Sequence, residues 1–361
     1  MKVVHLVPAM EQGGVETVVL ALNRVVVGNG WENVVVSKGG RLVERLVADG
    51  GRHVTLDVKS KNPLTYFWRA WKLRRFLKAE KPDLVCAHSR VPSWLFILAN
   101  RGLGIKWITY AHGANSVSRY SEVMTKGDLT VTPSRFLADY LKANYGLAEE
   151  RIRVINPAVD SDRFDPAKLD QTFVEERRRA WGIGPNDFVV MAVGRITPLK
   201  GYDALIKAVC RLQSNNLKLV IVGDADKNHH EYLALLKKLA GDGVIFAGGE
   251  SKVPECLSIA SVVVSSNTKK PESFGLSMAE ALVMGRPVVA KAFGGALDIV
   301  RDGADGVLVP ADAGDTVEAF AAAIDKVRSR AFGDIRSLAM ARFSVETMAK
   351  RTLGVYAEIL V

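Results

Sequence analysis

Two glutamates frame a segment whose loop and helix could hold one extended ligand. The sequence SSNTKKPESFGLSMAEAL covers residues 265–282, and its pattern predicts a loop that contains Glu272 and a helix that carries Glu280. At a rise of about 1.5 Å per residue, the two side chains lie roughly 12 Å apart along the helix axis. A carboxylate pair acting together on one glycosidic bond with retention needs about 5 Å. The spacing therefore predicts two acceptors of ligand hydroxyls, with an exposed helix glutamate as the structural alternative for Glu280.

The start of this predicted helix and a second loop both favour anionic oxygens. The first amides of a helix have no acceptor within the helix, so those from Phe274 to Ser277 suit a phosphate. The sequence GRITPLKG, residues 194–201, places Arg195 and Lys200 around a proline turn that follows a predicted strand. A planar guanidinium and a point charge together suit a diphosphate, although two solvated loop cations would leave the same pattern.

A glycine pair and a histidine follow strands in the N-terminal half. In EQGGVE, residues 11–16, Gly13 and Gly14 allow the backbone to approach a phosphate or a sugar, and a plain tight turn uses the same residues. The pattern is not GxGxxG, which disfavours a nicotinamide cofactor. His112 stands beside a glycine at a predicted strand end, where it serves either a ligand or the structure.

Parallel sheets are needed to position these residues. Short β-rich runs alternate with helical segments, which is typical of parallel sheets covered by helices, and ligands bind such sheets at the carboxyl ends of the strands. We expect N-terminal strands at residues 3–7, 33–37, 54–58, 84–87, 107–110, 129–132 and 152–155. We expect C-terminal strands at residues 188–193, 218–222, 244–247, 262–265, 287–290 and 306–309.

The length of 361 residues favours two domains. The polar, proline-containing stretch from Asn156 to Asn186 is the predicted linker, and we place the domains at residues 1–168 and 169–344. A last helix, at about residues 345–361, is followed by no strand, and we expect it to return to the first domain.

The net charge and its distribution limit the kinds of binding partner. A net charge of +10 calls for an anionic partner. The basic stretch 59–81 interleaves Phe67, Trp71 and Leu77 with cations at helical spacing, which suits an anionic membrane surface. A helix that packs its aromatic face on the sheet is the alternative. No nucleic-acid-binding module accompanies the charge, so we expect no nucleic acid partner.

The compartment follows from the cysteines and the hydropathy. Cys86, Cys210 and Cys256 lie far apart in or beside apolar segments, which favours reduced thiols. No run of about 18 apolar residues is present, so we expect a cytoplasmic protein whose membrane contact, if any, is peripheral.

Seven motifs in order give the chain a resemblance to the GT4 family of retaining GT-B glycosyltransferases, related to sucrose and glycogen synthases and to bacterial lipopolysaccharide and phosphoinositol-mannoside enzymes. They are GGVE, AHG, VTPSRF, INPAVDSDRF, GRITPLKG, VGD and the E-x7-E motif from Glu272 to Glu280. The resemblance implies an α/β GT-B fold, in which two facing Rossmann-like domains with parallel sheets leave a cleft between them. The acceptor would bind residues 1–168 and the nucleotide-sugar donor residues 169–344.

The resemblance also implies roles for single residues. The donor site would consist of Gly14, Arg195, Lys200, Glu272, Ser273, Phe274, Gly275, Leu276 and Glu280. Gly13 and Gly14 would contact the acceptor, and the catalytic residues would be His112, Arg195, Lys200 and Glu272. Two departures from the family pattern are Pro157-Ala158, where glycine is common, and Asp298, where glutamate is usual.

We therefore expect a metal-independent, retaining hexosyltransferase without a cofactor, acting on a lipid-linked or cell-surface oligosaccharide or polysaccharide. Asp224 and Asp226, with Asn228, His229 and His230, form an alternative metal site, but Arg195 and Lys200 already supply charge for a diphosphate. A GT-B sugar-nucleotide epimerase and a non-catalytic nucleotide-sugar-binding protein are also compatible with the predicted donor residues.

Overall fold

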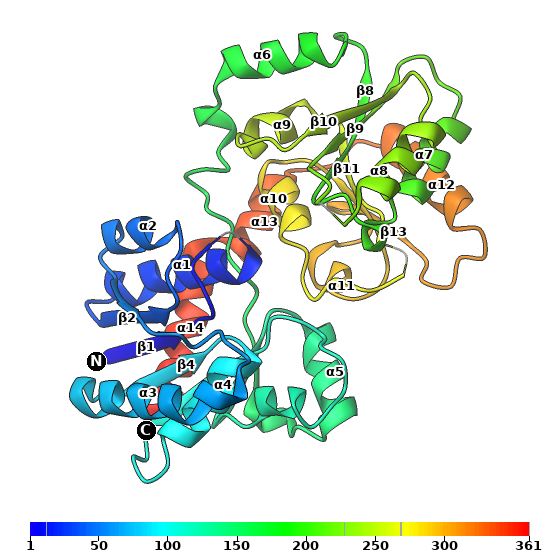
Figure 1. Ribbon diagram of the computed structural model, residues 1–361. Coiled ribbons are helices and arrows are strands. Elements are labelled where there is room, and N and C mark those ends of the chain that lie inside the picture. Colours follow the sequence, from blue (N-terminus) through cyan, green and yellow to red (C-terminus); the bar gives the residue numbers. More distant parts are fainter. Residues whose placement is uncertain (12, 227, 268, 361) are drawn as a thin grey trace. The chain divides into compact units, whose positions relative to one another are not determined.

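The computed structural model describes residues 1–11, 13–226, 228–267 and 269–360. Gln12, Lys227, Thr268 and Val361, which stand within segments discussed above, lie outside the described residues. The chain forms two compact units, one of Met1–Ala158 with the segment from Val345 onward, and one of Val159–Ser344. Each unit has one parallel sheet covered by helices, which confirms the predicted fold class (Figure 1).

The first unit contains a seven-stranded parallel sheet in the order β3-β2-β1-β4-β5-β6-β7. Its strands are β1 (Lys2–Leu6), β2 (Glu32–Ser37), β3 (Arg52–Thr55), β4 (Leu84–Ala87), β5 (Lys106–Tyr110), β6 (Leu129–Thr132) and β7 (Ile152–Val154). The prediction for β3 was displaced, because β3 pairs with β2 from Arg52 and β2 ends at Ser37, so Val58 has no strand beside it. Val58 instead packs into the core.

Helices cover both faces of this sheet. They are α1 (Gly14–Gly28), α2 (Val43–Ala48), α3 (Tyr66–Glu80), α4 (Arg90–Ala99), α5 (Arg135–Tyr145) and α14 (Val345–Leu360), with 3-10 turns η1 (Pro63–Thr65), η2 (Ser121–Thr125) and η3 (Glu149–Arg151). Successive side chains of a strand point to opposite faces. Val3 accordingly joins the core under α1 and α14, and Val4 joins the core under α3 and α4.

Helix α14 completes the core of the first unit, although it is last in the sequence. Figure 1 shows it in red among the blue elements of that unit. Its Tyr356 is fully buried, and the Tyr356 hydroxyl lies 2.9 Å from the hydroxyl of Tyr110 and 3.4 Å from the Cys86 sulfur. Buried polar groups need such partners, so this contact fixes the position of the helix.

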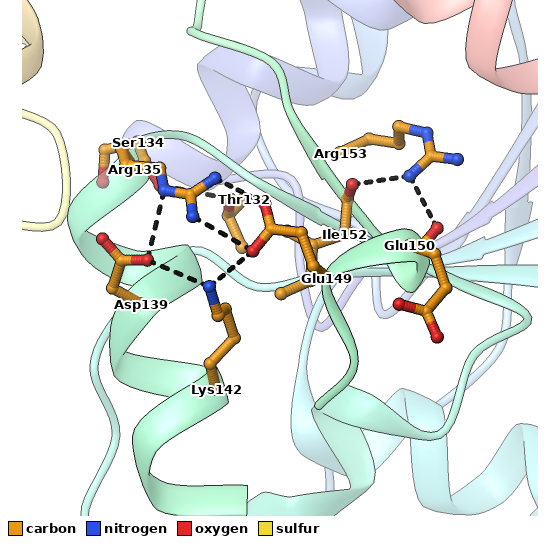
Figure 2. A network of polar contacts seen from close by, with 9 residues as sticks. All are labelled: Thr132, Ser134, Arg135, Asp139, Lys142, Glu149, Glu150, Ile152 and Arg153. Carbon is orange, nitrogen blue, oxygen red and sulfur yellow. Dashed lines mark hydrogen bonds and ion pairs between the residues drawn. The ribbon is translucent and has the colours of Figure 1, made fainter. Parts of the chain in front are cut away.

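A surface network fastens α5 to the turn before β7. Figure 2 shows Glu149 between Arg135 and Lys142, with Asp139 as a second partner of both cations. The hydrogen bonds from Arg135 and then Lys142 lower the pKa of the Glu149 carboxyl to about 2. All four side chains are solvated, so the network fixes a local geometry and contributes little to global stability.

The second unit contains a six-stranded parallel sheet in the order β10-β9-β8-β11-β12-β13. Its strands are β8 (Phe188–Val193), β9 (Leu217–Val222), β10 (Val244–Gly248), β11 (Val262–Ser265), β12 (Val288–Lys291) and β13 (Gly306–Val309). Its helices are α6 (Gln171–Ala180), α7 (Tyr202–Arg211), α8 (His230–Leu239), α9 (Val253–Ile259), α10 (Leu276–Val283), α11 (Ala296–Ile299), α12 (Thr316–Arg328) and α13 (Ile335–Phe343), with η4 (Pro166–Lys168) and η5 (Pro198–Lys200).

The boundary between the units falls after Ala158, before the position expected at residue 168. Val159 donates a backbone hydrogen bond of 2.8 Å to the Phe343 carbonyl, and both side chains lie in the core of the second unit. The predicted linker from Asn156 to Asn186 was also wrong in part, because it contains α6. That helix is mostly polar, but its Phe173 packs against the core and its N-terminus is capped by Asp170.

Candidate functional site

The loops expected to bind the donor follow the two central strands of the second unit. β8 pairs with β9 on one side and with β11 on the other, so the strand order reverses between β8 and β11. Ligands of open parallel sheets bind at this point, beyond the carboxyl ends of the strands. The loop after β8 carries Arg195 and Lys200, and the loop after β11 carries Glu272.

Lys200 and Glu272 form an ion pair between these two loops. Both side chains are largely shielded from solvent, with about a quarter and a fifth of their surfaces exposed. Gly194 has φ +148°, and a Cβ there would lie 3.2 Å from Lys200 Cε, so the glycine leaves room for the lysine stem. Ser266 Oγ donates a 2.8 Å hydrogen bond to the Lys200 carbonyl. Gly194 and Ser266 therefore hold Lys200 in the position in which it meets Glu272.

Arg195 stays apart from this pair. Its side chain is exposed and has no ion-pair partner among the described residues. An exposed guanidinium without a carboxylate keeps its five donors for an external anion. Of the two predicted diphosphate-binding cations, Lys200 is thus held by the protein, and Arg195 is not held by any part of the chain that the structure describes.

Glycine at position 275 brings the Glu272 carboxylate to the start of α10. Gly275 has φ +112°, and a Cβ on it would lie 2.8 Å from Glu272 Oε2 and 2.3 Å from Met278 Cε. A substituted residue would be strained and would displace both side chains. The amides at the start of α10 and the Lys200 ammonium thus lie beside one carboxylate, in a mixed site for phosphate and hydroxyl oxygens.

Phe274 offers its backbone to a ligand, because its ring is occupied. The ring is 5% exposed and packs edge-to-face on Phe343 at 5.8 Å between centroids. Gly295 donates 2.8 Å to the Glu272 carbonyl, and a Cβ on Gly295 would lie 2.2 Å from the Phe274 carbonyl. The glycine pair Gly294-Gly295 therefore packs closely against the backbone of the loop that carries Glu272.

Glu280 lies further along α10, and its carboxyl is a weaker acid than an ordinary glutamate. Burial raises its pKa to about 7, and the charge of Arg163 opposes this only partly. Its side chain makes no hydrogen bond or ion pair among the described residues. The residue keeps part of its surface exposed, so a carboxyl without a partner in the described parts of the chain is accessible here to a ligand's donors.

Asp224 and Asp226 serve two different loops. Asp224 Oδ1 accepts a 2.8 Å hydrogen bond from the Gly249 amide, whereas Asp226 Oδ1 lies 2.6 Å from His229 Nδ1. Over the described parts of the chain, no three His, Cys, Asp or Glu side chains come together as metal ligands would. The carboxylates therefore have structural partners, and the alternative metal site has no convergent ligand set there.

In the first unit, the strand order reverses between β1 and β4. Gly13 caps α1 and Gly14 is its first residue, so both stand on the segment that follows β1. A Cβ on Gly13 would lie 2.6 Å from Glu16 Oε2. The glycine thus lets the glutamate fold back over the first turn of the helix.

Three histidines form a hydrogen-bonded chain at the same edge. His5 Nδ1 lies 2.8 Å from His88 Nε2, and His88 Nδ1 lies 3.0 Å from His112 Nε2. The His88 ring also stacks on Tyr110 at 4.6 Å. Burial lowers the pKa of His5 to about 3 and of His112 to about 4, and it lowers the pKa of His88 well below the usual value. All three imidazoles are therefore neutral at pH 7.

The nitrogen that carries the proton in each of the three histidines follows from the surroundings of His5. Each neutral imidazole has one donor and one acceptor nitrogen. His5 Nε2 is buried with no partner among the described residues, and a buried donor left unpaired is rarer than a buried acceptor. We assign His5 Nδ1–H as the donor to His88, and His88 Nδ1–H as the donor to His112. His112 then carries its own proton on Nδ1.

The predicted residues thus divide into groups. Lys200, Glu272 and Gly275 meet at one point, Glu280 and Arg195 stand separately in the same unit, and His112 belongs to the other unit with Gly13 and Gly14. Sequence analysis missed His5 and His88. The available indication was that His88, like His112, comes just after a strand that the pattern predicted, whereas His5 lies inside the first strand and carried no such signal.

Two parallel-sheet units of this construction define the GT-B class of glycosyltransferases. A crystallised glycosyltransferase from Rickettsia africae has a TM-score of 0.88 and 25% sequence identity over 99% of this chain and 98% of its own. Anabaena HepE in complex with UDP has a TM-score of 0.83 at 20% identity, over 99% of this chain and 100% of its own. The second likeness concerns the fold alone.

Comparisons of sequence identify the family. Models described as "Glycosyltransferase Family 4" and "Glycosyl transferases group 1" match residues 12–163 and 173–331. A D-inositol 3-phosphate glycosyltransferase of Kribbella flavida is 30% identical over 76% of this chain and 70% of its own length. The chain belongs to the GT4-like GT-B glycosyltransferases. It spans about half the length of several curated relatives, such as 54% of the enzyme of that name from Nocardioides, which is 32% identical over 65% of this chain.

Proposed function

We propose that the protein is a retaining, metal-independent glycosyltransferase that moves a hexose from a nucleoside diphosphate sugar to a lipid-linked or cell-surface oligosaccharide or polysaccharide acceptor. The observation that carries this proposal is the Lys200–Glu272 pair at the start of α10, with the Glu280 carboxyl, unpaired among the described residues and with a raised pKa, further along that helix. Cation, helix amides and two carboxylates are what a diphosphate joined to a ribose and a hexose requires.

Each group has a separate task in this proposal. Lys200, Arg195 and the first amides of α10 bind the diphosphate and stabilise the charge that develops on it. Glu280 accepts hydrogen bonds from the ribose hydroxyls, while Glu272 and the backbone from Ser273 to Leu276 accept and donate hydrogen bonds to the hexose. From the first unit, His112 supplies its neutral Nδ1–H to the hexose, and Gly13 and Gly14 bring the backbone close to the ligands.

The transfer needs no protein nucleophile. The bond between the anomeric carbon and the phosphate oxygen breaks, and the acceptor oxygen bonds to the same carbon from the same face. The acceptor's hydroxyl proton passes to the leaving phosphate oxygen, so atoms and charges balance. Lys200 and Arg195 lower the cost of the negative charge on the leaving group, which is the task of a divalent ion in other enzymes.

A soluble phosphorylated acceptor is the second candidate. Several relatives are named D-inositol 3-phosphate glycosyltransferase, and a net charge of +10 suits such an anion. An epimerase or a non-catalytic nucleotide-sugar-binding protein would use the same donor residues without an acceptor. Release of free hexose or of an epimer in the absence of an acceptor would favour the epimerase. Binding of a nucleotide sugar without any turnover would favour the non-catalytic binding protein.

An anionic membrane surface is the proposed location of the reaction, on its cytoplasmic side. Trp68 and Trp71 are about half exposed on α3, with Lys72 Nζ 3.6 Å from the Trp68 ring centre and Arg75 Cζ 5.1 Å from that of Trp71. The alternative, in which α3 packs its aromatic side chains on the sheet, is wrong for these residues, because Leu73 and Leu77 occupy that face. No helix in the described ranges is long and apolar enough to cross a bilayer.

Liposome sedimentation tests this location. Reversing the charge of Lys72 and Arg75 to glutamate should reduce binding to vesicles with anionic lipid and leave the weak binding to neutral vesicles unchanged. Equal binding of the variant and the parent protein to anionic vesicles would remove the membrane from the proposal.

A thermal-shift panel tests the donor site. UDP, GDP, ADP and CMP sugars are compared with and without EDTA, because a ligand of the native state raises Tm by mass action. We expect one nucleoside diphosphate sugar to stabilise the protein equally with EDTA, and Lys200→Ala and Glu280→Ala to lose the effect. Glu318→Ala, at an exposed glutamate of α12 that pairs with Arg211, is the matched control. A shift that requires a metal, or none at all, would refute this donor site.

A further inference from the structure

A pocket of about 460 Å³ opens in the first unit beside the exposed face of α3. Its walls come from η1, the start of α3, α4 and the loop before η2, and its aromatic and aliphatic lining includes Pro63, Tyr66, Phe67, Val91, Trp94 and Tyr120. Phe67 is 72% exposed, and the neighbouring Leu64 is 91% exposed. A pocket of this size is large enough for a substantial part of a ligand.

Two polar groups on the aromatic wall of the pocket, and one on the loop before it, are already hydrogen-bonded within the protein. The Tyr66 hydroxyl donates 2.8 Å to the Trp94 carbonyl, and Trp94 Nε1 donates 3.0 Å to the Tyr120 carbonyl. Asn62 Oδ1 accepts a 2.9 Å hydrogen bond from the Leu64 amide. A sugar placed against these rings would lose hydrogen bonds to water that the already bonded Tyr66 and Trp94 groups cannot replace. A hydrocarbon would lose none, so the lining favours a hydrocarbon chain.

The charges around the pocket point to an anionic head group. Arg69 and Lys61 line the pocket together with apolar residues, and no carboxylate of the described residues lines it. Arg69 is buried, and its guanidinium donates to Thr65 Oγ1 and to the carbonyls of Asp57 and Asn62. Its charge also attracts the Asp57 carboxylate, which does not line the pocket. From residue 59 to residue 79 the sequence has no acidic side chain. An anion near the pocket would therefore meet positive charge.

The pocket belongs to the same sheet edge as the histidine chain. Val91 and Trp94 lie on α4, which follows β4 and His88, while Tyr120 lies on the segment that follows β5 and His112. Arg90, at the start of α4, places its guanidinium 5.3 Å from the Tyr120 ring and donates to Ser121 Oγ. A ligand in the pocket would thus lie on the segments that follow β4 and β5, beside the histidine chain.

We propose that this pocket holds the hydrocarbon chain of the acceptor, which is an amphiphile with an anionic head group. The inference rests on the proposed function for the existence of an acceptor and adds its chemical class. Lys61 and Arg69 attract the head group, and the rings of Phe67, Trp94 and Tyr120 enclose the first part of the chain. A soluble sugar phosphate would leave the pocket empty.

Titration calorimetry with n-alkyl phosphates tests this assignment in the absence of any donor. Across hexyl, octyl and decyl phosphate, below their micelle concentrations, affinity should rise about fourfold per methylene, because a buried CH₂ contributes about 0.8 kcal/mol. Val91→Trp, which fills the pocket, and Phe67→Ala, which opens an exposed wall, should each weaken decyl phosphate at least tenfold. Trp71→Ala, on the exposed face of α3 outside the pocket, should leave it unchanged.

The outcomes separate this inference from the proposed function. Equal affinity for hexyl and decyl phosphate would overturn the pocket assignment. An equal loss of decyl phosphate affinity in Trp71→Ala and Phe67→Ala would also overturn it, because it would show general adsorption to α3. Stabilisation by a nucleotide sugar is measured on the same variants and should be unaffected by all of them. Chain-length-dependent binding without any nucleotide effect would retain the pocket and refute the donor site instead.

Discussion

At the scale of single residues, the histidine chain decides what His112 can donate. A histidine at a strand end is a common feature, and its chemistry depends on which nitrogen is protonated. Here that choice is fixed at the far end of the chain, by the buried Nε2 of His5 acting through His88. Because burial keeps all three rings neutral, His112 presents a fixed donor whose charge does not vary around pH 7.

Replacing the middle of the chain should therefore affect transfer without unfolding the protein. His88→Phe keeps a ring that can stack on Tyr110 and removes both nitrogens. We expect kcat to fall about 100-fold, as misplaced catalytic groups usually cause, with little change in donor KM. Nitrogen-15 NMR should show His112 protonated on Nδ1 in the parent protein and a mixture of tautomers in the variant. His53→Phe, in the same unit, is the control, and an unaltered His112 spectrum in His88→Phe would contradict the assignment.

Glu280 should make nucleotide binding depend on pH near neutrality. Its carboxylate form accepts the ribose hydroxyls, and with a pKa of about 7 only about a tenth of the free protein is in that form at pH 6. The apparent Kd of the cognate nucleotide should therefore be about tenfold higher at pH 6 than at pH 8. Calorimetry at both values checks this, and Glu280→Gln should bind at least tenfold more weakly at pH 8 and lose the pH dependence.

The same group should lower stability as pH rises. Its folded-state pKa is raised above 4.5, so between about pH 4.5 and 7 the folded protein binds more protons than the unfolded chain. The contribution of Glu280 to stability is therefore complete below pH 4.5 and is lost as pH rises through 7. In urea unfolding, Glu280→Gln should gain stability relative to the parent protein over this window. A constant difference between the two proteins would contradict the raised pKa.

At the scale of elements, a buried ion pair holds α13 to the loop before β13. Asp305 is fully buried, bonds to Arg342 and accepts a 2.7 Å hydrogen bond from the Arg301 amide. Asp305→Ala should reduce the free energy of unfolding by about 3–5 kcal/mol, because it strands the Arg342 charge. Replacing both, as Asp305→Leu with Arg342→Met, should recover most of the loss.

Urea unfolding followed by circular dichroism measures this difference. The surface pair of Arg211 and Glu318 offers the comparison, since both side chains are more than half exposed. Arg211→Met should change stability by less than about 1 kcal/mol. A similarly small effect of Asp305→Ala would show that the buried pair does not hold α13.

Strands whose buried residues are continuous in sequence were predicted most closely, whereas elements fixed by long-range contacts were not. The runs that became β4, β6, β8, β11 and β13 match their predicted bounds because their residues, including Thr130 and Thr132 of β6, are largely buried on both faces. α6 was missed because only Phe173 and Val174 of its polar sequence reach the core. The Lys200–Glu272 pair joins residues far apart in sequence, and β3 ends where its neighbour ends. These features depend on tertiary pairing, which no local pattern contains.

At the scale of the whole molecule, each unit has its own hydrophobic cores. A nucleotide that binds the second unit should therefore stabilise that unit selectively. At a free nucleotide concentration of 100 times Kd, its free energy of unfolding should rise by about 2.7 kcal/mol. Trp181 is the only one of the six tryptophans in residues 159–344, so the fluorescence of Trp181→Phe reports on the first unit alone. That signal should not move with nucleotide while the calorimetric transition of the second unit does. An equal shift of both would refute independent unfolding.

The position of α14 also sets an order for synthesis on the ribosome. Residues 1–158 emerge first, but the helix that covers their Tyr110 and Cys86 is made only after the whole of the second unit. At about 5–20 residues per second, the wait lasts roughly 10 to 40 s. The second unit can close during that time, whereas the first displays an uncovered apolar sheet face to solvent. The half of the enzyme that begins first thus finishes last, and nascent chains should engage chaperones through that face.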